Sequence, residues 1–74
     1  MRETINEILI EILELDDANV ELLDREKNAT WDSIKHLEII MAIEEEFDIR
    51  FTATEVTTVK TIQDLYEYVE KKLV

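Results

Sequence analysis

The 74-residue chain contains neither glycine nor proline. Tight hairpin turns depend on residues that tolerate positive φ, usually glycine or asparagine, so an architecture of short β-strands is disfavoured. Cysteine is also absent and there is one histidine, so neither disulfides nor a histidine-rich metal site can reinforce so small a fold. We therefore expect residues 1–74 to form a single all-α domain, whose core draws on the 46% of residues that are hydrophobic.

The net charge of −11, from eight basic and nineteen acidic residues, bears on partners more than on fold. Such a surface repels nucleic acid and anionic lipid headgroups and attracts basic protein surfaces. No apolar run approaches the roughly 20 residues that span a bilayer, and the first residues lack the features of a signal peptide. We expect a cytoplasmic protein without membrane insertion, and the lack of cysteine is compatible with that compartment.

The first part of the chain predicts a helix followed by a long loop. Thr4 and Glu7 have the spacing of a capping box, so the helix should begin there, and its periodicity ends near Asp16. Its apolar stripe comprises Ile5, Ile8, Leu9, Ile12, Leu13 and Leu15. Residues 17–31 lose this periodicity and favour a loop of a length that is often functional. Three apolar residues of the loop should point to the core: Val20, Leu22 and Leu23.

A second helix is predicted over residues 33–47, with Asp32 as its N-cap. At about 100° per residue, one face is apolar and the opposite face is mixed. The inward face comprises His36, Ile39, Ile40, Ile43 and Phe47. The outward face comprises Ile34, Glu38, Met41 and Glu45.

Two further capping signals complete the secondary structure. Thr52 and Glu55 form a capping box for a short third helix that ends near Thr57, and Thr61 caps the last helix. The buried stripe of the last helix comprises Ile62, Leu65, Tyr66, Val69 and Leu73. Lys71 and Lys72 lie in its last turn, where cations suit the negative end of the helix dipole. The expected fold is thus an all-α four-helix bundle with three longer helices, a short third helix and a long loop between helices one and two.

Residues that could carry chemistry centre on Ser33. Ser33 and His36 are three apart and could touch, but a serine hydrolase also needs an oxyanion hole, for which the chain offers no glycine-rich turn. The acidic run over residues 44–48 is typical of a solvated face, so no metal site is predicted. A serine in the first turn of a helix lies at its positive end, which favours an attached phosphate. The alternative is that Ser33 is an ordinary residue at a helix start.

Residues 31–49 resemble the Asp-Ser-Leu motif and second helix of acyl carrier proteins, with Asp32-Ser33-Ile34 at the motif and Glu-Glu-Glu-Phe at the helix end. Residues 60–69 are similar to the closing helix of that family, so the resemblance covers nearly the whole chain. The sequence Trp31-Asp32-Ser33 resembles specialised free-standing carriers, or carrier domains of multienzyme synthases, more than the housekeeping fatty-acid carrier.

The resemblance implies a function for Ser33 and its neighbours. A phosphopantetheinyl transferase would move 4′-phosphopantetheine from coenzyme A onto Ser33 in a reaction that uses Mg²⁺, with Asp32 as the other motif residue. The thiol of this covalent cofactor would carry acyl groups as thioesters, so a chain without cysteine would become a phosphoprotein that carries cargo. The carrier itself would not be an enzyme.

The resemblance also implies docking to basic surfaces of acyl-processing enzymes. The residues expected to dock are Ile34, Glu38, Met41, Glu44 and Glu45. Lys35 and the weakly acidic third helix depart from fatty-acid carriers, so the pathway could be lipid, polyketide or related biosynthesis. We expect the chain to be a monomer that functions as an acyl carrier protein. The alternatives are a peptidyl or D-alanyl carrier with aminoacyl cargo, and an acidic helical interaction module without a prosthetic group.

Overall fold

The computed structural model describes residues 1–16 and 19–73. These residues form α1 (Arg2–Leu13), the 3₁₀ turn η1 (Val20–Leu22), α2 (Ser33–Phe47), α3 (Ala53–Thr58) and α4 (Ile62–Leu73). The described residues contain no β-strand, and their only β-type pairing is an isolated antiparallel bridge between Asp24 and Thr61. The all-α fold with three longer helices and a short third helix is confirmed.

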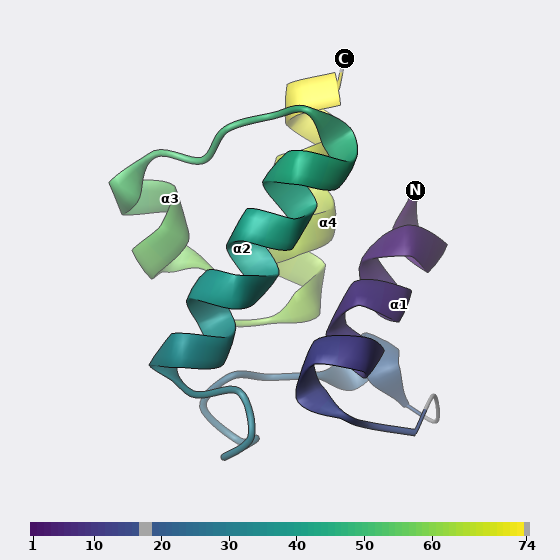
Figure 1. Ribbon diagram of the computed structural model, residues 1–74. Coiled ribbons are helices and arrows are strands. Elements are labelled where there is room, and N and C mark those ends of the chain that lie inside the picture. Colours follow the sequence, from purple (N-terminus) through teal and green to yellow (C-terminus); the bar gives the residue numbers. More distant parts are fainter. Residues whose placement is uncertain (17–18, 74) are drawn as a thin grey trace.

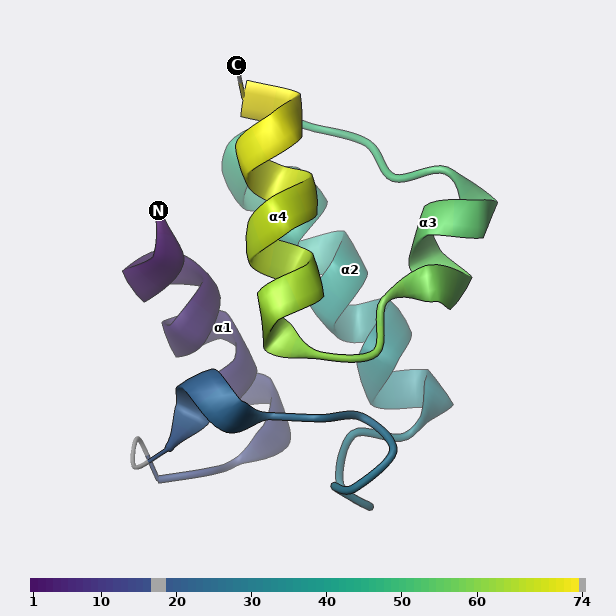
Figure 2. The same ribbon diagram turned by 180° about the vertical axis from the view of Figure 1, so that it is seen from behind.

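The helices α2 and α4 form the centre of the bundle, with α1 on one side and α3 on the other (Figures 1 and 2). The chain enters α2 from the long loop, which crosses the end of the bundle where α1 finishes. The core lies between α1, α2 and α4, and α3 contributes no fully buried side chain. The side chains with no exposed surface are Ile5, Leu9, Ile39, Ile43, Val59, Ile62, Leu65 and Val69.

The predicted start and end of α1 are wrong. The helix begins at Arg2 with Met1 as an N-cap that makes no side-chain bond, so Thr4 lies inside the helix. Contacts with α4 hold this extra turn: Arg2 Nε donates to Glu70 at 3.1 Å, and the Arg2 guanidinium lies 4.8 Å from the centre of the Tyr66 ring. The helix ends at Leu13, before Asp16, because Glu14 takes the left-handed conformation with φ 55°.

Two of the apolar side chains predicted to be buried are exposed. Leu22 is 78% exposed, whereas Val20 is buried and Leu23 is half-buried as expected. The tight 3₁₀ geometry of η1 directs Val20 into the core, which leaves Leu22 on the outer side of the turn. Leu73 is also exposed, since the last turn of α4 extends past the core. Residues 17 and 18 of the predicted loop lie outside the described residues.

The loop is fixed to the start of α4. The Ile62 amide donates to the Leu23 carbonyl at 3.1 Å, and the Arg25 amide donates to the Lys60 carbonyl at 2.6 Å. These bonds flank the bridge between Asp24 and Thr61. The segment that leads to the second helix therefore has a defined path across the bundle.

The capping predictions for the later helices are confirmed. The Thr52 hydroxyl and the Glu55 carboxylate bond reciprocally to each other's backbone amides at the start of α3. Thr61 and Asp64 make the same reciprocal exchange at the start of α4. The third helix includes Thr57 and extends one residue further, to Thr58.

Candidate functional site

Ser33 is the first residue of α2, and its side chain is exposed. Asp32 is the N-cap: its carboxylate accepts from the Lys35 amide at 2.8 Å, and its carbonyl accepts from the His36 amide at 2.8 Å. The cap therefore fixes the first turn and leaves the Ser33 hydroxyl at the positive end of a 15-residue helix. Ser33 is also the only serine in the chain.

Beneath Ser33, Trp31 and His36 form a buried hydrogen-bonded pair. Trp31 is 2% exposed and His36 is 4% exposed. The Trp31 indole Nε1–H donates to His36 Nδ1 at 3.0 Å, and His36 Nε2 lies 2.8 Å from the carbonyl oxygen of Val56. Because Nδ1 accepts, the ring proton lies on Nε2, which donates to Val56. One neutral imidazole thus joins the loop, α2 and α3.

Burial lowers the pKa of His36 below its ordinary value of 6.5, and the positive charge of Arg25 acts in the same direction. The bond to the Val56 carbonyl opposes these effects by favouring the protonated ring. With both ring nitrogens engaged, His36 has no acceptor to take a proton from Ser33, so the hydrolase alternative is not favoured. Trp31 packs the loop against the bundle.

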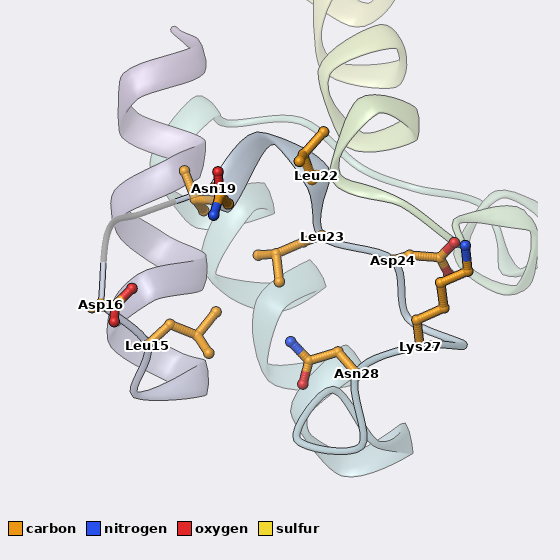
Figure 3. Close-up of a pocket in the computed structure, with 9 residues that line it drawn as sticks. Leu15, Asp16, Asn19, Leu22, Leu23, Asp24, Lys27 and Asn28 are labelled. Carbon is orange, nitrogen blue, oxygen red and sulfur yellow. The ribbon is translucent and has the colours of Figure 1, made fainter.

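A groove of about 440 Å³ lies between the loop, the first turns of α2 and α3. It is lined by Arg25, Trp31, Ser33, His36, Leu37, Val56 and Thr57. Sequence reasoning missed Arg25, Leu37 and Val56 as site residues, because they come from three separate segments. A different hollow, of about 330 Å³, lies between the end of α1, η1 and the following loop (Figure 3), and its lining residues include neither Ser33 nor His36.

The outward face of α2 carries the residues predicted for docking. Ile34 is 71% exposed and Met41 is 66% exposed, and Glu38 and Glu45 are exposed beside them. Leu37 is also exposed and adds to the apolar part of this face.

Glu44 differs from the other predicted docking residues. Its carboxylate accepts from the Phe51 amide at 2.8 Å and pairs with Arg50 at 3.7 Å, and its side chain is only 16% exposed. Glu44 therefore holds the segment that leads to α3, and its carboxylate is the least accessible of the set.

Within the part of the chain that the structure describes, no group of three acidic, histidine or cysteine side chains could hold a metal ion. None of the described helices is long and apolar enough to cross a membrane.

Comparison with known proteins places this geometry in a family. The family model for the phosphopantetheine attachment site matches residues 3–69. The chain belongs to the phosphopantetheine-binding acyl carrier family. It is 37% identical over 67 residues to an acyl carrier protein of Trieres chinensis, a match that covers 89% of this chain and 84% of that protein. It is 32% identical over 73 residues to polyketide-8 synthase acyl carrier protein 2 of Streptomyces avermitilis, a match that covers 97% of this chain and 84% of that protein.

A third relative, an acyl carrier protein of Bdellovibrio bacteriovorus, is 44% identical over 41 residues, which span 55% of this chain and 53% of that protein. Among solved structures, a Mycobacterium tuberculosis protein assigned to the acyl carrier proteins matches with a TM-score of 0.86 at 28% identity, with 95% of each chain covered. The acyl carrier proteins carry a covalently attached 4′-phosphopantetheine and are carriers rather than catalysts.

The residues around Ser33 fit this cofactor. A phosphodiester needs an exposed hydroxyl and gains from the positive end of a helix, and Ser33 provides both. The adjacent groove is lined by three apolar side chains, three polar ones and one cationic side chain, Arg25.

Proposed function

We propose that Ser33 is the residue to which 4′-phosphopantetheine is attached, and that residues 1–74 act as a single acyl carrier domain. The observation that carries the proposal is the exposed hydroxyl of the chain's only serine at the capped, positive end of α2, within the family's matched region. When bound, the cofactor supplies the thiol that carries acyl groups as thioesters.

The attachment step requires the Ser33 oxygen to form a bond to the phosphorus that bears the pantetheine half of coenzyme A. The bond between that phosphorus and the bridging oxygen breaks, and the adenosine bisphosphate half leaves with the electron pair. The hydroxyl proton passes to a base on the transferase, since His36 has no free acceptor. The role of this chain is to present the hydroxyl on a rigid, capped helix turn.

The test is incubation with coenzyme A, Mg²⁺ and a broad-specificity phosphopantetheinyl transferase, followed by intact-mass analysis. The protein should gain one phosphopantetheinyl group, and Ser33→Ala should gain none. Thr30→Ala is the matched control, because it removes an exposed hydroxyl from the same loop. No mass gain by the unaltered protein would favour the interaction module without a prosthetic group.

The outward face of α2 is the proposed docking surface for the transferase and for basic surfaces of acyl-processing enzymes. Ile34 and Met41 offer apolar contact, and Glu38 and Glu45 supply charge that steers association and weakens as salt rises. Glu38→Lys should slow transfer onto Ser33 more at low salt than at high salt. Glu67→Lys makes the same charge change on α4 and should leave the rate unchanged, and equal rates for both variants would contradict this surface.

The acyl cargo is proposed to belong to lipid, polyketide or related biosynthesis, and the polyketide synthase carrier among the relatives supports the second of these. We also propose a cytoplasmic location, with which the lack of cysteine is compatible, and a monomer, because a net charge of −11 opposes self-association.

A further inference from the structure

Arg25 is a half-buried cation that lines the same groove as Ser33. Five other basic side chains pair with carboxylates: Arg2, Lys35, Arg50, Lys60 and Lys72. The guanidinium of Arg25 forms no ion pair within residues 1–16 and 19–73, although the chain has nineteen acidic residues. An unpaired guanidinium in the same groove as an acceptor hydroxyl can serve as a recognition group for an anion.

The backbone around Arg25 is fixed, so the guanidinium starts from a defined position. The Arg25 amide donates to the Lys60 carbonyl at 2.6 Å, next to the bridge between Asp24 and Thr61. The neighbouring carboxylate of Asp24 accepts from the Glu26 amide at 2.9 Å, and Glu26 pairs with Lys60. The two nearest acidic side chains along the chain therefore have other partners.

We propose that Arg25 binds the phosphodiester formed on Ser33 and so holds the pantetheine arm in the groove, an inference that rests on the proposed attachment at Ser33. The phosphodiester carries one negative charge beside the Asp32 carboxylate, on a molecule whose net charge is already −11. Arg25 offsets that repulsion, and its planar guanidinium can donate two bonds to two phosphate oxygens. Leu37 and Val56 give the apolar part of the arm a surface to lie on.

The competing arrangement is an arm that projects freely into solvent. The two arrangements differ in whether the geminal methyl groups of the arm contact Leu37 and Val56, which NMR cross-relaxation measures directly. The phosphorus signal of the arm gives a second readout at Ser33 itself.

The experiment uses the protein loaded with the arm, in the unaltered form and as Arg25→Gln and Lys27→Gln. Lys27 is the matched control, because it lies two residues away in the same loop, is exposed, and lines the other hollow rather than this groove (Figure 3). Indole fluorescence of Trp31, the only tryptophan, confirms that each variant keeps the folded loop.

We expect cross-peaks between the arm and the groove in the unaltered protein and in Lys27→Gln, with a shift of the phosphorus signal that high salt reverses. In Arg25→Gln the cross-peaks should fall roughly threefold, the scale expected for an ion pair at a partly exposed site, and Arg25→Lys should restore part of them. Equal cross-peaks in all variants, or none in the loaded unaltered protein, would overturn the role of Arg25. Failure to load the unaltered protein at all would instead overturn the attachment at Ser33.

Discussion

Replacing His36 with leucine tests the buried bond network beneath Ser33. The substitution removes the acceptor of the Trp31 indole N–H, in a buried bond of 3.0 Å, and the donor to the Val56 carbonyl, in a partly buried bond of 2.8 Å. A buried polar group left without a partner costs about 1 to 3 kcal/mol. Leucine regains part of this through apolar burial, so we expect a net loss of about 2 to 4 kcal/mol in the free energy of unfolding.

The same substitution should also change how stability depends on pH. Burial lowers the pKa of His36 in the folded protein below 6.5, so the unfolded chain takes up the proton first as pH falls. The stability contributed by neutral His36 is therefore complete above pH 6.5 and is lost as pH falls through the lowered pKa. The difference in stability between the unaltered protein and His36→Leu should shrink over that range.

Urea denaturation followed by Trp31 fluorescence and by circular dichroism measures both effects, from about pH 5 to about pH 7.5. His36→Gln is the conservative comparison, because an amide can both accept and donate, and it should lose less than the leucine variant. A leucine variant within about 0.5 kcal/mol of the unaltered protein, the range of a neutral surface change, would show that the two bonds of His36 do not stabilise the fold. A stability difference that does not vary with pH would refute the pH argument.

Three further perturbations test other parts of the fold. Thr52→Ala removes the capping box of α3 and should lower the free energy of unfolding by about 1 kcal/mol in denaturation experiments, whereas Thr54→Ala, in the first turn of the same helix, should lower it by less than half of that. Equal losses in the two variants would contradict the role of the cap. Glu14→Gly should raise the free energy of unfolding by about 0.5 to 1 kcal/mol, because Glu14 has φ 55° and glycine adopts positive φ without steric cost, whereas Glu11→Gly inside α1 should lower it. A destabilised Glu14→Gly would show that the Glu14 side chain contributes more than the steric cost of its positive φ. Raising salt from about 0.01 M to about 0.15 M shortens the screening length from about 30 to about 8 Å, so the melting temperature should rise, and a flat response would show that the charge of −11 does not destabilise the fold.

The helix starts that could be predicted from the sequence depend on a side chain and a backbone amide three residues apart. Asp32 caps α2 through the Lys35 amide, and the pairs Thr52 with Glu55 and Thr61 with Asp64 form reciprocal caps. These interactions are complete within a single turn, so a short window of sequence contains both partners. For the same reason the position of Ser33 in the first turn of α2 could be predicted.

The features that could not be predicted depend on residues far apart in the chain. The extra first turn of α1 is held by Arg2 with Glu70, which lie 68 residues apart and outweigh the local signal at Thr4. The site also depends on distant residues: His36 bonds to the carbonyl of Val56, which lies 20 residues further along the chain. Arg25 lines the groove from a loop whose backbone is bonded to Lys60. The burial predicted for Leu22 was wrong because periodicity does not report the direction of a 3₁₀ turn.

Peptide mapping of the protein purified from cells that contain a phosphopantetheinyl transferase tests the attachment at Ser33 directly. Cleavage after Lys27 and Lys35 releases residues 28–35, which hold Ser33 and one other hydroxyl residue, Thr30. We predict that this peptide carries a phosphopantetheinyl group and that its fragments place the group on Ser33. An unmodified peptide, or a group placed on Thr30, would contradict the assignment.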